Sequence, residues 1–142
     1  MKEKNIKVIF DTNVWVSFLI GKSLSILKQY IVEGNITIVM SEQLFNELSQ
    51  VTGREKMKKY FPKKSVNELI DLLEIIAEIV VIKPTHKLCR DVKDNFLFDL
   101  IDYSKADYLV TGDKDILEHN PFLTESIISP TEFEKEMEIK FK

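Results

Sequence analysis

KVIFDTN, at residues 7–13, is the segment that decides the fold of this 142-residue chain. Its apolar residues VIF favour a buried β-strand, and the polar residues DTN follow at once. In parallel sheets flanked by helices, ligands bind at the carboxyl ends of the strands. Asp11 stands at such an end, and it is therefore the first candidate for a functional site.

The rest of the chain alternates between short apolar runs and segments with helical periodicity. The apolar runs recur at residues 36–40, 79–82, 108–110 and 127–128. This alternation predicts an α/β fold, a three-layer α/β/α sandwich whose central, mainly parallel sheet has four to five strands. Because the sequence contains no repeat, low-complexity tract or linker, we expect a single domain over residues 1–142.

Composition places the protein in a reducing compartment. The single cysteine, Cys89, cannot form an internal disulfide. The charged amino terminus runs directly into a short strand, too short for a signal peptide or a membrane span. We therefore expect a soluble, cytoplasmic protein with no membrane partner.

Positive charge is concentrated in one segment, although the net charge is −3. Residues 53–64, GREKMKKYFPKK, carry six positive charges and one negative charge. A solvated surface accounts for this pattern, and so does a patch that contacts RNA phosphates. In the second interpretation the contacts come from Arg54, Lys56, Lys58 and Lys59.

The helix expected after the second strand carries an acid beside its apolar face. Ser41 is placed to cap this helix, and Leu44 and Leu48 fall within one narrow arc of it. Glu42 points to the far side, whereas Glu47 lies at the edge of the apolar face. Glu47 is thus a candidate site residue, although a half-exposed surface role also fits.

Two further helices are expected in the middle of the chain. A capping box at residues 65–68 predicts that the first of them starts at Ser65. The second opens near Asp94, which lies at the border of the buried face and also suits a helix cap. Asp99 and Asp102 are expected to point largely toward solvent.

A second strand exit resembles the first one in composition. TGDKD, at residues 111–115, follows the strand at residues 108–110 and again combines a hydroxyl, a glycine and acids. All strand exits of a parallel sheet share one edge. We therefore expect four carboxylates to approach each other there: Asp11, Glu47, Asp94 and Asp113.

Carboxylates that approach so closely require a counter-charge. Two unit charges about 4 Å apart interact with roughly 4 kcal/mol at an effective dielectric constant of 20. A divalent cation removes this repulsion, and oxygen ligands without histidine or cysteine select Mg²⁺ or Mn²⁺ over zinc. Acidic sites with such ions hydrolyse phosphodiesters.

Four segments, taken in order, resemble the PIN-domain family. They are DTN at residues 11–13, Ser41 with Glu47, RDVKDN at residues 90–95 and ADYLVTGDKD at residues 106–115. The chain is most similar to the small prokaryotic PIN proteins assigned as toxins of toxin-antitoxin pairs. The resemblance implies a PIN-like endoribonuclease that depends on Mg²⁺ or Mn²⁺, is commonly a homodimer, and is often held inactive by an antitoxin protein.

The resemblance also assigns roles to individual residues. Four acids match the family's acidic quartet, whose members are catalytic residues and metal ligands: Asp11, Glu47, Asp94 and Asp113. Asn13 and Thr111 match polar residues that orient carboxylates or water, and Asp115 matches an accessory acid. Because Val92 and Lys93 replace the usual residues of the third motif, Asp91 is a rival to Asp94 as the third ligand.

Two other functions compete with a ribonuclease. A phosphohydrolase with a nucleophilic aspartate needs a second acid, either directly beside the first acid or two residues after it. In this chain the residue two positions after the first acid is Asn13. A non-catalytic PIN-like module that binds nucleic acid or protein is the second alternative. Retention of the full acidic quartet favours the ribonuclease.

Overall fold

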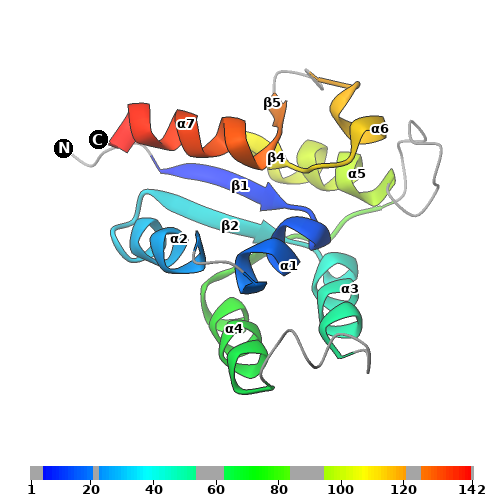
Figure 1. Cartoon of the computed structure of the whole chain (residues 1–142). Coiled ribbons are helices and arrows are strands. Elements are labelled where there is room, and N and C mark those ends of the chain that lie inside the picture. Colours follow the sequence, from blue (N-terminus) through cyan, green and yellow to red (C-terminus); the bar gives the residue numbers. More distant parts are fainter. Residues whose placement is uncertain (1–4, 21–22, 54–62, 84–94, 121–125, 142) are drawn as a thin grey trace.

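A computed structural model describes residues 5–20, 23–53, 63–83, 95–120 and 126–141 of the chain. Strands and helices alternate along these residues (Figure 1). The strands are β1 (Ile6–Phe10), β2 (Ile36–Met40), β3 (Glu78–Ile79), β4 (Tyr108–Val110) and β5 (Ser126–Ile128). The helices are α1 (Thr12–Ile20), α2 (Ser23–Val32), α3 (Glu42–Thr52), α4 (Lys63–Ile76), α5 (Asn95–Ser104), α6 (Lys114–Leu117) and α7 (Pro130–Phe141).

The five strands form one sheet in the order β3-β2-β1-β4-β5, and every neighbouring pair is parallel. The ring of Phe10 on β1 contacts both Trp15 of α1 and Phe133 of α7, so α1 and α7 cover the same face of the sheet, and Figure 1 shows α5 behind the sheet, on the other face. The predicted three-layer α/β sandwich with a mainly parallel sheet is therefore confirmed. No helix within the described ranges is both long and apolar enough to cross a membrane.

β1 occupies the centre of the sheet, between β2 and β4. Its residues Val8, Ile9 and Phe10 are fully buried, as expected for a strand covered on both faces. Asp107 fixes the register of β1 against β4, because its carboxylate accepts the Lys7 N–H at 2.9 Å and its own N–H donates to the Lys7 carbonyl at 2.8 Å.

This register aligns the carboxyl ends of β1 and β4. Phe10 lies opposite Val110, and the N–H of Asp11 donates to the Val110 carbonyl at 3.0 Å. The residues that follow the two strands, Asp11 and Thr111, therefore come side by side. The fold places two polar strand exits, distant in sequence, at one edge of the sheet.

α3 begins as expected from the sequence. The hydroxyl of Ser41 accepts the Leu44 N–H at 3.2 Å and so caps the helix. Leu44 and Leu48 are fully buried, Glu42 is exposed, and Glu47 is half-buried. The prediction that Glu47 lies at the edge of the apolar face is therefore confirmed.

Two predicted boundaries are wrong. α4 starts at Lys63, two residues before the capping box at Ser65, because lysine is a good helix former and the helix extends through both lysines. β3 contains only Glu78 and Ile79, although residues 79–82 were expected to form the strand. Its neighbour β2 ends at Met40, which limits how far the regular pairing can extend.

The expected exposure of Asp99 is also wrong, since this side chain is only 2% exposed. A helical wheel assigns one buried face and one solvent face. α5, however, is buried around most of its circumference, as the burial of the adjacent residues Phe98 and Leu100 shows. Asp99 therefore lies inside the fold, and its burial follows from tertiary packing rather than from helical periodicity.

Candidate functional site

Asp11 links the central strand to the first helix. It follows β1 directly, and its carbonyl accepts the N–H groups of Val14 and Trp15 at 3.0 and 3.2 Å. Only 9% of the residue is exposed. The Asp11 carboxylate is thus held at the start of α1, where the positive end of a helix dipole favours negative charge.

Thr111 connects Asp11 to the exit of β4. Its hydroxyl donates a hydrogen bond to Asp11 Oδ2 at 2.8 Å, across 100 residues of sequence. The same hydroxyl oxygen accepts the N–H of Asp113 at 3.1 Å. Thr111 is fully buried, and its own N–H donates to the Ile128 carbonyl at 3.0 Å, so β5 holds this residue in place.

Asp113 is the second acid of this group. It caps α6, and its Oδ1 accepts the N–H of Asp115 at 2.9 Å. The side chain of Asp113 is half-buried, so its second carboxylate oxygen remains for other contacts at the same edge. Asp115, by contrast, contributes its backbone N–H to the group.

The pKa of the Asp11 carboxyl is raised above its ordinary value of 3.8. Burial is the largest cause, because it disfavours the charged form, and the negative charge of Asp113 acts in the same direction. Hydrogen bonds from Thr111, Thr12 and Asn13 oppose this shift without overcoming it. Asp11 and Asp113 are therefore close enough to repel each other, and a cation between them would relieve that repulsion.

The donor atoms of this group are suited to a hard cation. Two carboxylates, Asp11 and Asp113, meet at the edge of the sheet beside the hydroxyl of Thr111. Oxygen ligands of this kind fit Mg²⁺ or Mn²⁺. Within the described ranges, no three acidic, histidine or cysteine side chains are grouped closely enough to hold a metal ion. Asp11 and Asp113 therefore do not make up a metal-binding group by themselves within the described residues.

The other predicted site residues divide into two groups. Glu47 lies on α3, which packs against α1, and Asn13 is exposed in the first turn of α1. The backbone N–H of Asn13 is one of the hydrogen-bond donors to the Asp11 carboxylate. Six predicted residues lie outside the residues that the structure describes: Arg54, Lys56, Lys58, Lys59, Asp91 and Asp94. Asp94 directly precedes Asn95, the first residue of α5.

Thr12, the middle residue of the DTN segment, was assigned no role of its own from the sequence. It is 2% exposed, and its hydroxyl has no hydrogen-bond partner among the described residues. A buried hydroxyl without a partner costs free energy, which a water or ligand oxygen would recover. The sequence signal was weak, because a threonine between Asp11 and Asn13 fits an exposed helix start equally well.

The chain is similar to known proteins over most of its length. Residues 7–115 match the sequence profile described as "PIN domain". An uncharacterized protein of Methanocaldococcus jannaschii, MJ1680, is 31% identical over 155 residues, which cover 97% of this chain and 96% of that protein.

A solved structure shares the fold. It is the crystal structure of VapBC2 from Rickettsia felis bound to a DNA fragment from their promoter. One of its chains superimposes with a TM-score of 0.54 at 17% identity, over 87% of this chain and 98% of that one. At this level of identity the similarity concerns the fold alone.

The raised pKa of Asp11 predicts how the stability of the metal-free protein depends on pH. Above pH 3.8 the unfolded chain releases the Asp11 proton before the folded chain does, and this favours unfolding. The free energy of unfolding of the wild type should therefore fall relative to that of Asp11→Asn as the pH rises. Urea denaturation in EDTA between pH 4 and 7 measures this difference.

Asp71→Asn is the matched control for this experiment, because Asp71 is exposed on α4. The difference between wild type and this control should vary little with pH. A pH-independent difference between wild type and Asp11→Asn would contradict the assignment of a destabilising charge at Asp11.

Proposed function

Since this chain belongs to the PIN-domain family, whose members are generally nucleases, we propose that it is a Mg²⁺- or Mn²⁺-dependent endoribonuclease. The observation that carries this proposal is the group formed by Asp11, Thr111 and Asp113 at the carboxyl edge of the sheet. A buried acid with a raised pKa, close to a second acid, is typical of a functional site. The arrangement is suited to a divalent ion.

The proposed metal ligands are Asp11 and Asp113, completed by Asp94 and by Glu47, directly or through water. When bound, an ion of this kind would activate a water for attack on the phosphodiester and would neutralise charge at the phosphate. Thr111 holds the Asp11 carboxylate in one orientation through its 2.8 Å hydrogen bond. Asn13 and Asp115 are supporting residues in this proposal, and Asp91 is the alternative to Asp94.

The proposed substrate is RNA, which the acidic site cannot attract by itself. The net charge of −3 gives no general attraction for a polyanion. The basic segment with Arg54, Lys56, Lys58 and Lys59 is the proposed source of phosphate contacts. It precedes α4 in the sequence.

An antitoxin protein is the proposed regulator. The fold is shared with VapBC2 from Rickettsia felis, and the present chain has an apolar groove suited to a protein partner. The groove has a volume of about 360 Å³ and lies between α2 and α4. It is lined by Ile31, Val32, Glu68, Leu72 and Ile76.

Replacing an acid of the site should separate metal binding from folding. Asp11→Asn should remove the rise in melting temperature that Mn²⁺ gives to the wild type and reduce RNA cleavage at least 100-fold, as expected when a metal-held water is lost. Thermal shift with Mn²⁺ and cleavage of a mixed RNA pool, with and without EDTA, measure the two effects. Asp71→Asn should behave as the wild type does.

The outcome also distinguishes the competing functions. Metal binding by a folded wild-type protein that cuts no RNA in the pool would favour the non-catalytic binding module. The absence of any Mn²⁺ effect on the wild type would contradict the metal centre. Unfolding of Asp11→Asn in EDTA would assign Asp11 a structural role instead.

Thr111 should tune the affinity for the ion. Thr111→Val removes the hydroxyl that lowers the pKa of Asp11, so Mn²⁺ affinity should fall by roughly 10- to 100-fold. The loss of Mn²⁺ affinity should be larger at pH 6 than at pH 8, because at the lower pH a proton competes with the ion for Asp11. Calorimetric titration measures it, and Thr111→Ser should restore most of the affinity. Equal losses in both variants would contradict the role of the hydroxyl.

The groove between α2 and α4 gives a test of the proposed regulator. Leu72→Glu places a charge in the apolar groove and should weaken antitoxin binding at least tenfold, because a charge buried there would be unpaired. Inhibition of RNA cleavage by purified antitoxin is the measurement. Cleavage by the variant alone should be unchanged. Full inhibition of Leu72→Glu would exclude this groove as the docking site.

A further inference from the structure

One buried hydroxyl beside the candidate site makes no hydrogen bond. Five residues with hydroxyl side chains are buried in the described part of the chain: Thr12, Ser41, Thr52, Ser104 and Thr111. The hydroxyl groups of the last four all form hydrogen bonds within the protein. Oγ1 of Thr12 has no partner. Since a buried hydroxyl without a partner lowers stability, this exception calls for a physical explanation.

The position of Thr12 in the chain explains why the fold supplies no partner. Thr52 and Ser104 each donate to the carbonyl group four residues earlier in the same helix, at 2.8 and 2.6 Å. Thr12 is the first residue of α1, so the residue four positions earlier is Val8, which lies within β1. No preceding helical turn offers a carbonyl to this hydroxyl. A partner for it therefore has to come from outside the helix.

Thr12 is joined directly to the buried acid of the candidate site. Its backbone N–H is a hydrogen-bond donor to the Asp11 carboxylate, and only 2% of the residue is exposed. The Asp11 carboxylate also accepts the Thr111 hydroxyl at 2.8 Å, but it forms no hydrogen bond with the Thr12 hydroxyl. The unpartnered oxygen thus belongs to the same turn of the chain as a proposed metal ligand.

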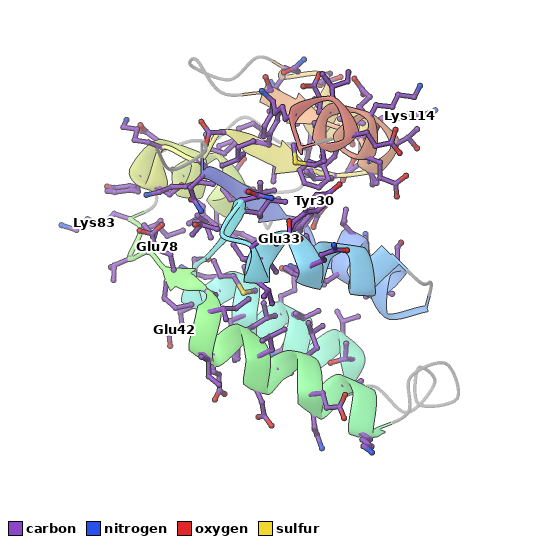
Figure 2. All side chains as sticks on the ribbon, turned by 90° about the vertical axis from the view of Figure 1, so that its left-hand side faces the viewer. Tyr30, Glu33, Glu42, Glu78, Lys83 and Lys114 are labelled. Atoms are coloured by element: carbon purple, nitrogen blue, oxygen red, sulfur yellow. The ribbon has the colours of Figure 1, made fainter. Side chains whose placement is uncertain are left out.

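The lysine that adjoins the acidic pair in the sequence does not neutralise it. Lys114 directly follows Asp113, but it is exposed, and Figure 2 shows its side chain directed outward from the molecule. The ion pairs found within the described ranges join other residues. A hydrated cation would meet two needs at once, because it brings positive charge for the acids and an oxygen for the hydroxyl.

The water of a hydrated ion is the kind of partner that Thr12 lacks. Mg²⁺ usually keeps several water molecules when carboxylates bind it. These water molecules are hydrogen-bond donors, and a hydroxyl oxygen has two lone pairs that accept. Threonine in a helix adopts two χ1 rotamers, so its hydroxyl changes direction without a change in the backbone.

We propose that Thr12 is a positioning residue of the metal centre, whose hydroxyl accepts a hydrogen bond from a water molecule that hydrates the ion. This inference rests on the proposed function, because it requires a divalent ion at Asp11. The hydroxyl destabilises the empty protein, and the hydrogen bond to the water recovers that cost when the ion is present. Thr12 then couples the stability of the first turn of α1 to the occupancy of the site.

Replacing Thr12 by valine tests the cost of the hydroxyl in the empty protein. Valine keeps the branched shape of threonine and carries a methyl group in place of the hydroxyl. In EDTA the melting temperature of Thr12→Val should rise by about 3 °C or more, because an unsatisfied buried group is removed. Thr52→Val is the matched control. The hydroxyl of Thr52 has a partner at 2.8 Å, so this control should show no rise.

The same variant should bind the ion more weakly although it is the more stable protein. Calorimetric titration with Mn²⁺ should give Thr12→Val an affinity roughly 10- to 100-fold below that of the wild type, as for other outer contacts of metal sites. Thr12→Ser keeps the hydroxyl and loses a buried methyl group. It should be less stable than the wild type in EDTA and should bind Mn²⁺ nearly as tightly, and Thr52→Val should bind Mn²⁺ as the wild type does.

Opposite changes in stability and affinity distinguish the proposed role from packing alone, which would move both in the same direction. Wild-type Mn²⁺ affinity in Thr12→Val, or an equal loss in Thr12→Ser, would overturn the inference and leave the metal centre in place. A lower melting temperature of Thr12→Val in EDTA would overturn it as well. If the wild type itself binds no Mn²⁺, the proposed metal centre is wrong, and this inference is wrong with it.

Discussion

The hydrogen bond between Thr111 and Asp11 is the contact on which the candidate site depends. It joins the exits of β1 and β4 at 2.8 Å, and it exists because Asp107 sets the register of these strands through two hydrogen bonds with Lys7. A slip of one residue would turn Asp11 to the other face of the sheet. The backbone ladder therefore determines the chemistry at its end.

The environment of Asp11 combines opposing effects. Burial and the charge of Asp113 disfavour the ionised carboxylate, whereas Thr111 and two backbone N–H groups favour it. Sites that are electrostatically strained when empty gain most from the ligand that relieves the strain. Two acids assembled at the sheet edge therefore form an environment that a cation would relieve.

Much of this arrangement follows from the sequence, because it rests on local patterns. The apolar runs of β1, β2 and β4 mark the strands, and the polar residues after β1 and β4 mark one edge, where Asp11 and Asp113 were expected to approach each other together with Glu47 and Asp94. The structure joins Asp11 and Asp113 through Thr111, whereas Asp94 lies outside the described residues. The sequence of either segment alone does not show that β1 and β4 are neighbours in the sheet. Likewise, the burial of Asp99 depends on what packs around α5, which helical periodicity does not specify.

The order of the strands has a consequence for protein synthesis. β1 leaves the ribosome before β4, its partner in the site, because Thr111 follows Asp11 by 100 residues in the chain. Contacts between residues so far apart form late and slowly during folding. A nascent chain therefore carries Asp11 without Thr111 and Asp113 while the 100 residues between Asp11 and Thr111 are synthesised. If the folded protein cuts RNA, this topology protects the messenger that encodes it until β4 and the residues after it have been synthesised.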